Sequence, residues 1–428
     1  MTDSKDSRAE PALRPWSMVI GLGLVSLTID MVADGAASVS GLLLEQLGAT
    51  AVLVGLVSGG AEALALLLRL VTGPWADRTG AYWTFTIVGY ALTAISVPLL
   101  AVTPLIGSAG LAVACVLLLV ERTGKAIRAP SKTVLLADPA AAVGMGRGFG
   151  VHKLLDQIGA FAGPLVVATI TAALGMLWPA FLALIVPASV AMVLLLWLRA
   201  KVPDPSLYRP RQIPTPPGVP DAAEGPDPSL VQPSPAQAPG ETPTGTDVVT
   251  FALFSLFAGL TGFGLVSYGV ISFHLAATQM VPVAAVPLVY AVGMAAAALA
   301  ALTTGLAYDR WGPAVLVAVP IMTAFVPGLA LGPSLAGVIG GVVLWGAASG
   351  VQDSTVKALV AELVPGRRRG AAYGWFAVSQ GVGALSGALV AGALYGNIPL
   401  LVVIVGVLQA FALVALWAVL RRRARGSS

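Results

Sequence analysis

Residues 73–80 read GPWADRTG, and residues 305–312 read GLAYDRWG. Both stretches fit the pattern G-x-x-x-D-R-x-G, and the second lies 232 positions after the first, counted from Asp77 to Asp309. A charged octapeptide that recurs at such a distance indicates that one structural unit is present twice in the chain.

The composition excludes an ordinary soluble domain. Charged residues make up 10% of the 428-residue chain, hydrophobic residues make up 57%, and the mean hydropathy is +0.89, whereas roughly 25% of a typical soluble domain is charged. We therefore predict a polytopic membrane protein. The chain has one cysteine, Cys115, and no Cys/His spacing typical of a metal site, so we expect no internal disulfide, no metal and no other cofactor.

Apolar runs of about 20 residues, the length that crosses a bilayer as a helix, recur along the chain between Gly, Pro or charged residues. They predict twelve transmembrane helices, at about 16–42, 50–72, 84–103, 106–127, 147–173, 176–199, 248–275, 281–304, 313–331, 335–358, 371–394 and 398–420. The expected fold is an all-α membrane protein whose helices form two pseudo-symmetric six-helix bundles.

The predicted domains are a cytoplasmic tail (1–15), an N-terminal bundle (16–199), a linker (200–247), a C-terminal bundle (248–420) and a basic tail (421–428). The linker holds 13 of the 31 prolines and is expected to be a disordered or partly extended tether. If the N-terminus is cytoplasmic, the outer connections contain none of the 24 Lys and Arg residues, as the positive-inside rule requires. We expect a multi-pass protein of the cell (inner) membrane with both termini in the cytoplasm.

With twelve spans, a central linker and the two octapeptides at matched positions, the chain resembles the major facilitator superfamily (MFS) over nearly its whole length. Four stretches are similar to a bacterial branch of efflux permeases: AEALALLLRLVTGPWADR (61–78), ERTGKAIRAPSKTVLLAD (121–138), GRGFGVHKLLDQIGAFAGP (146–164) and ELVPGRRRGAAYG (362–374). The resemblance implies the MFS fold and transport, but it fixes no substrate. The basic residues that usually follow the first D-R-x-G are replaced by Ala81, Tyr82 and Trp83.

Ionisable residues at membrane depth are costly and mark candidate sites. Asp30 and Asp34 lie one turn apart in the first predicted helix, and Glu62 lies near the middle of the second. Charged partners are expected at the end of the fourth helix and the start of the fifth: Glu121, Arg122, Lys125, Arg128, His152, Lys153 and Asp156. The second half contributes Tyr268, Tyr290, Asp353 (with Lys357) and Gln380.

Because desolvation disfavours the charged form of a carboxylate, Asp30, Asp34 and Glu62 are candidates for a proton switch. The alternative is that they are permanently ionised partners of Arg122, Lys125 or Lys153 and serve helix packing. We expect Asp156 and Lys153, three residues apart, to form a structural pair.

The octapeptides supply a candidate cytoplasmic gate: Gly73, Asp77, Arg78, Gly80, Gly305, Asp309, Arg310 and Gly312. The resemblance implies that the two aspartates contact a helix N-terminus in the opposite half and hold that side shut, while the glycines permit tight turns and close approach. The alternative is a positive-inside anchor formed by the arginines alone. A separate stretch, GAFAGP at 159–164, offers Gly159, Gly163 and Pro164 for close helix packing and is similar to an exporter motif of the family.

The leading hypothesis is a secondary active transporter that works by alternating access and exports a small amphipathic drug or metabolite in exchange for protons. The chain has no P-loop, HExxH or GxSxG, which argues against direct ATP coupling and against a membrane enzyme. Alternatives are a carrier of an organic anion or cation, a lipid or lysolipid flippase, and a sensor that no longer transports. The expected partners are a small-molecule substrate, protons and the bilayer, without nucleic acid, and we expect a monomer.

Overall fold

The computed structural model describes residues 13–208, 245–352 and 369–426. All regular elements in these ranges are helices. The first half contains α1 (Pro15–Ala37), α2 (Ser40–Gln46), α3 (Ala51–Thr79), α4 (Tyr82–Leu99), η1 (Leu100–Leu105), η2 (Gly107–Ala109), α5 (Gly110–Val143), α6 (Met145–Leu174), α7 (Trp178–Ala183), α8 (Ile185–Lys201) and η3 (Pro205–Tyr208). The second half contains α9 (Gly245–Gly264), α10 (Tyr268–Ala277), η5 (Val283–Ala285), α11 (Val286–Trp311), η6 (Gly312–Val317), α12 (Ala318–Ala330), α13 (Leu335–Val351), α15 (Arg369–Ala393) and α16 (Ile398–Gly426).

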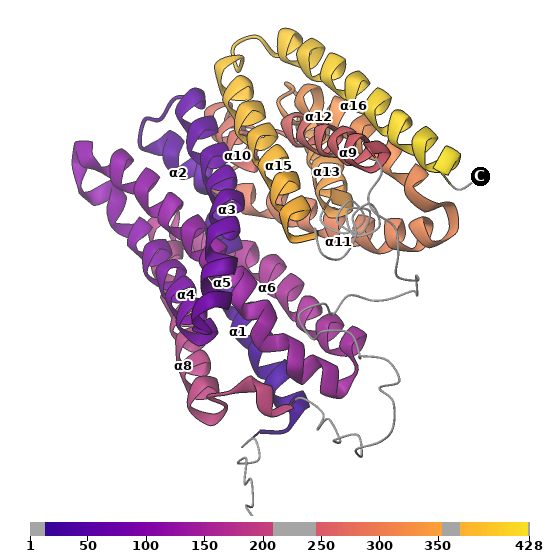
Figure 1. Ribbon diagram of the computed structural model, residues 1–428. Coiled ribbons are helices and arrows are strands. Elements are labelled where there is room, and N and C mark those ends of the chain that lie inside the picture. The colour runs from indigo at the N-terminus through magenta and orange to yellow at the C-terminus, as the bar shows by residue number, and fades with distance from the viewer. Residues whose placement is uncertain (1–12, 209–244, 353–368, 427–428) are drawn as a thin grey trace, which may run out of the picture.

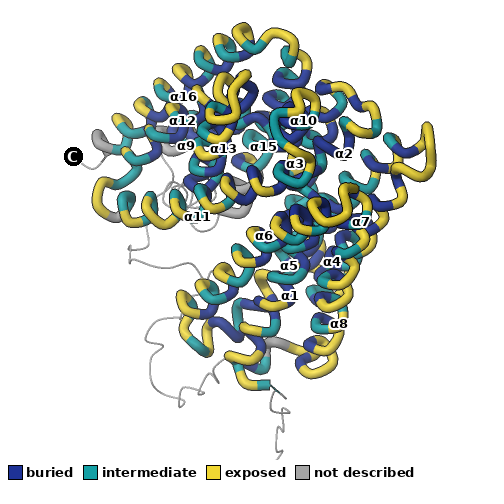
Figure 2. Tube along the Cα trace, turned by 180° about the vertical axis from the view of Figure 1, so that it is seen from behind, coloured by how far each residue is buried: buried dark blue, intermediate teal, exposed yellow. Residues whose placement is uncertain are grey.

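Ten segments in the described ranges are long and apolar enough to cross a membrane. The two other expected spans correspond to α5, whose apolar part is interrupted by Glu121, Arg122 and Lys125, and to α13, a shorter apolar helix. Large apolar side chains are exposed on several helices, among them Val193, Leu306 and Phe411. Figure 2 shows exposed residues in yellow along α8, α11 and α16, which carry these three. Such a surface suits lipid rather than water.

The fourth predicted span is longer than expected. We placed its end near residue 127, but α5 runs for 34 residues to Val143 and includes Pro130 and Pro139. Neither proline ends the helix, and the segment between them buries Ser131, Leu135 and Leu136. The charged stripe that begins at Glu121 therefore lies in the middle of α5 and not at its end.

The repeated octapeptide ends a helix in each half. Gly80 follows α3 with φ of 62°, and Gly312 follows α11 with φ of 64°. A side chain is strained in this left-handed region, so glycine is the residue that closes both helices. Gly73 and Gly305 do not form turns as we expected, because both lie inside these helices, and a Cβ on Gly305 would meet nothing within 4 Å.

Both ends of the described chain lie at one face, called here the tail face, which carries the start of α1 and the end of α16. The opposite, distal face carries α2, η1 and the end of α6, which meet around one small cavity. The two halves diverge from the distal side toward the tail face (Figure 1). The expected tether falls largely on 209–244, and Asp353, Lys357 and the stretch 362–368 also lie outside the described residues.

Candidate functional site

The first helix carries the centre of the polar network. Ser26, Asp30 and Asp34 are spaced by four residues and therefore share one face of α1. Asp30 forms an ion pair with Arg128 of α5, with 3.6 Å between its Oδ1 and the arginine Nη2. The Asp30 side chain is 16% exposed and that of Arg128 only 4%, so the pair lies in the interior of the first half.

The Arg128 guanidinium is held by two residues of α4. It donates a hydrogen bond of 2.6 Å to the hydroxyl of Thr93, and its Cζ lies 5.0 Å from the ring centroid of Tyr90. A guanidinium fixed in this way presents a stable positive charge to Asp30. Arg128 is one of the cationic partners that the sequence predicts on the fourth span. It is not among Arg122, Lys125 and Lys153, the partners named in the alternative of permanently ionised acids, and it forms the ion pair with Asp30.

A hydrogen-bonded cluster adjoins this pair on the side of the tail face. The Ser26 hydroxyl lies 3.1 Å from the hydroxyl of Tyr90, 3.2 Å from Nε2 of His152 and 3.0 Å from Nζ of Lys132. Lys132 and His152 both approach Oδ1 of Asp156, at 3.5 and 3.7 Å. Polar atoms thus connect α1, α4, α5 and α6 through the interior of the first half.

The predicted pair of Lys153 and Asp156 is present at 3.8 Å, but the Lys153 side chain is 68% exposed. Asp156 also forms an ion pair with Lys132, whose side chain is less exposed than that of Lys153. The sequence analysis did not name Lys132. Lys132 lies one helical turn after Arg128 and continues the row of Lys125 and Arg128 along α5. The sequence therefore contains this row, but a span predicted to end near residue 127 does not include Lys132.

Asp34 contacts the opposite half of the molecule. The hydroxyl of Tyr290 on α11 donates a hydrogen bond of 2.8 Å to its Oδ1, and both residues are buried. Tyr290 packs edge-on against Tyr268 with ring centroids 4.7 Å apart, and Trp345 of α13 lies 5.4 Å from Tyr268. Two of these aromatic residues were predicted, whereas Trp345 lies in an apolar run that gave no signal.

Arg122 lies near this contact. Its Nε is 3.4 Å from Oε2 of Glu121, and it also interacts electrostatically with Glu62, Asp34 and Tyr290. The Arg122 side chain is 23% exposed and Glu62 is exposed. These residues present both signs of charge next to the aromatic group of the second half.

The remaining predicted residues have other surroundings. Gln380 donates to Gln352 at 3.4 Å within the second half, and Asp77 accepts a hydrogen bond of 3.2 Å from Tyr82, five residues on. Arg78 and Arg310 are exposed, while the side chain of Asp309 lies outside the described part. Lys125 interacts electrostatically with Asp30.

The GAFAGP stretch brings α6 against α1. A Cβ on Gly159 would overlap the main chain of Leu27, and a Cβ on Gly163 would overlap the main chain of Met31. Pro164 lies inside α6 and is buried. The two glycines therefore permit the close approach that brings His152 and Asp156 to Ser26.

Main-chain and small side-chain contacts join the two halves on the distal side. The Gly41 N–H donates to the hydroxyl of Ser272 at 3.0 Å, and the Ser58 and Ser267 hydroxyls are 2.7 Å apart. Nearer the start of α3, a Cβ on Gly55 would overlap the carbonyl of Ala388. The hydrogen bonds described between the two halves all lie between the Asp34 level and the distal face.

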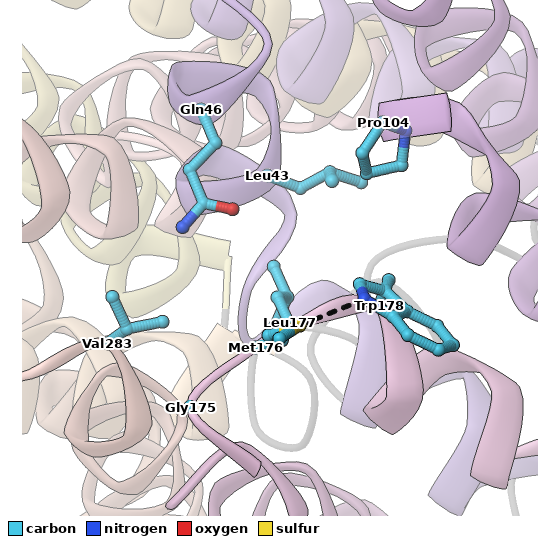
Figure 3. Close-up of a pocket in the computed structure, with 8 residues that line it drawn as sticks. All are labelled: Leu43, Gln46, Pro104, Gly175, Met176, Leu177, Trp178 and Val283. Carbon is cyan, nitrogen blue, oxygen red and sulfur yellow. Dashed lines mark hydrogen bonds between the residues drawn. The ribbon is translucent and has the colours of Figure 1, made fainter. Parts of the chain in front are cut away.

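A small cavity also lies at the distal face, away from the charged cluster. It has a volume of about 260 Å³ and is lined by Leu43, Gln46, Pro104, Gly175, Met176, Leu177, Trp178 and Val283. Figure 3 shows these side chains, with the indole N–H of Trp178 donating to the sulfur of Met176 at 3.3 Å. The lining is uncharged, so it does not extend the polar site.

Comparison with known proteins agrees with this architecture. The chain matches the Major Facilitator Superfamily over residues 20–313 and again over 249–428, and it belongs to that family. It is therefore an all-helical secondary transporter of the membrane and not a member of an enzyme family.

Among its relatives, uncharacterized proteins of Mycobacterium tuberculosis and Mycobacterium bovis are 41% identical over 418 residues, which cover 97% of this chain and 96% of theirs. A mutant of the nucleoside transporter NupG has a similar fold, with a TM-score of 0.68, 13% identity and coverage of 95% of this chain and 99% of its own. A D-xylose-proton symporter has a TM-score of 0.64 and 14% identity, with coverage of 94% of this chain and 97% of its own. At these identities the two structures support the fold alone.

Proposed function

We propose that this transporter couples the export of a small amphipathic solute to protons, with Asp34 as the group that links protonation to conformation. The observation that carries the proposal is the hydrogen bond from Tyr290 to Asp34, a contact between a hydroxyl of one half and a carboxyl group of the other. In alternating access one half rocks against the other. A contact that joins the halves on the distal side must break when that side opens.

The protonation state of Asp34 affects the strength of this contact. A hydroxyl donates a stronger hydrogen bond to an ionised carboxylate than to a neutral one. Loss or gain of a proton therefore changes the free-energy difference between the two conformations. Asp30, one helical turn from Asp34, is a second carboxyl group on the same face of α1, and it is paired with Arg128.

The proposed orientation puts the tail face in the cytoplasm. The positive-inside rule supports it, because Arg78, Arg199, Arg310 and Arg421 lie at the tail-face ends of their helices. The structure then corresponds to a conformation closed on the outside. Export is favoured by the resemblance to efflux permeases, and the solute would lie between Arg122, Glu62 and the aromatic group of Tyr268, Tyr290 and Trp345.

The test uses the purified chain in proteoliposomes with a pH-sensitive dye in the lumen. Ethidium and taurocholate serve as amphipathic probes of opposite charge. An imposed pH gradient is expected to drive movement of at least one probe, and Asp34→Asn should abolish this movement while Glu45→Gln, on α2, retains it. If neither probe moves with the pH gradient, or if Asp34→Asn behaves as the parent does, the coupling proposal is wrong.

A charged-solute carrier is the second candidate, favoured by the exposure of Glu62 and the partial exposure of Arg122. Such a carrier would respond to membrane potential at equal pH on both sides. Movement of only one probe, driven by a potassium diffusion potential and unaffected by Asp34→Asn, would support it over proton coupling.

A further inference from the structure

The last helix carries a stripe of exposed apolar side chains that ends in charge. Val403, Val407, Phe411 and Val414 are exposed at helical spacing along α16. The stripe ends at Trp417, which is 53% exposed, and Arg421 follows one turn later. A change from lipid-exposed apolar side chains to tryptophan and arginine marks the level of the lipid headgroups.

The tryptophan and the arginine are in contact. Cζ of Arg421 lies 4.0 Å from the ring centroid of Trp417. Stacking on an indole uses the face of the guanidinium and leaves the N–H groups at its edge available to a planar or tetrahedral anion. Arg422, the next residue, is also exposed.

A second stripe ends in the same way on α11. Leu299, Leu302 and Leu306 are exposed at helical spacing, and Arg310 and Trp311 follow at the tail-face end of the helix. Trp311 is 67% exposed, and Cζ of Arg310 lies 5.9 Å from its ring. The arginine of the second octapeptide is thus the basic member of another arginine–tryptophan pair.

The two pairs flank one short segment. The 3-10 helix η6 continues directly from Trp311 and packs against α16. Figure 1 shows the end of α16 close to the orange turn between α11 and α12. The set Arg310, Trp311, Trp417, Arg421 and Arg422, called here the C-terminal collar, therefore lies on one side of the tail face.

We propose that the C-terminal collar binds the headgroup of an anionic phospholipid, with the acyl chains along the α16 stripe. Charge complementarity favours this occupant, because a phosphodiester accepts hydrogen bonds from the edge of a guanidinium. The adjoining apolar stripe favours a lipid over a soluble phosphate. Each basic residue near such a surface strengthens the attraction to anionic lipid, and the site does not depend on the transported solute.

The test measures lipid binding to the purified full-length chain in detergent by native mass spectrometry. The probes are phosphatidylglycerol, phosphatidylcholine with the same acyl chains, and sn-glycerol 1-phosphate without chains. We expect phosphatidylglycerol to bind at least about tenfold more tightly than the other two probes. Combined Arg310→Gln, Arg421→Gln and Arg422→Gln should reduce that preference by about tenfold or more, and Trp417→Leu, which keeps every charge, should reduce it severalfold.

The matched control removes three charges from the first half of the same face, as Arg14→Gln, Arg199→Gln and Lys201→Gln, and should keep the preference. Equal losses in both triple variants would show diffuse electrostatics and overturn the proposal. Equal binding of phosphatidylcholine, or of sn-glycerol 1-phosphate, would also overturn it. If circular dichroism shows that the collar triple variant is unfolded, the preference for phosphatidylglycerol is measured in the single variants Trp417→Leu, Arg421→Gln and Arg199→Gln. The proposal requires that the first two lose preference and that Arg199→Gln keeps it.

Discussion

Tyr290→Phe removes one hydroxyl from the contact between the two halves and leaves the ring in place. The lost hydrogen bond, 2.8 Å from the hydroxyl to Oδ1 of Asp34, is buried. A hydrogen bond to a charged group contributes about 1.5–3 kcal/mol. In the proposed mechanism this bond breaks when the distal side opens, so its loss should shift the equilibrium toward distal opening by about 10- to 150-fold.

Electron–electron resonance between two spin labels measures this shift. Labels at Gln46→Cys on α2 and Ala277→Cys on α10, in a Cys115→Ser background, place one exposed probe on each half at the distal face. Tyr290→Phe should increase the population with the longer label distance. The control is Tyr268→Phe, which loses a bond of 3.1 Å to the Val286 carbonyl within one half. Unchanged distances in Tyr290→Phe, or the same change in both variants, would refute the assigned role of the contact.

Three further outcomes follow from the packing and the ion pair. Gly55→Ala places a methyl group against the Ala388 carbonyl and should open the distal side in the same resonance measurement, whereas Gly60→Ala, with its nearest neighbour 4.0 Å away, should not; equal behaviour of the two would contradict the close-packing argument. Arg128→Met leaves the Asp30 charge without its ion-pair partner and should lower the free energy of unfolding, measured by denaturant titration, by about 3 kcal/mol. Adding Asp30→Asn should recover part of this loss. If the losses of the two single variants simply add in the double variant, the two side chains do not stabilise each other. Gly163→Leu should prevent α1 and α6 from packing and give aggregated protein on size-exclusion chromatography, while Gly146→Ala, in open space, should elute as the parent does; a normal profile for Gly163→Leu would contradict the need for close approach.

The fold could be predicted because its signals are local in the sequence. Apolar runs report membrane spans, and the two octapeptides mark equivalent helix ends in the two halves through Gly80 and Gly312. The extent of α5 was underestimated because Pro130 and the nearby charges looked like the end of a span. That error hid Lys132 and placed Arg128 at the edge of the network instead of near its centre.

The partners within the site were harder to predict than its members. Asp34 and Tyr290 were both candidates, but they are separated by 256 positions, and helical periodicity says nothing about which faces meet between two bundles. Ser26 and Tyr90 are neutral residues in apolar runs, and only the three-dimensional packing of α1 against α4, α5 and α6 shows that they connect charged groups.

Glycine contacts between the two halves near the distal face leave the choice of solute to other residues. Gly55, Gly59 and Gly392 approach the main chain or small residues of the opposite half, so closure there depends mostly on backbone shape. The side chains that would face a solute, such as Glu62 and Trp345, take no part in those glycine contacts. New solute preferences can therefore arise by exchange of these side chains while the same backbone closure continues to operate.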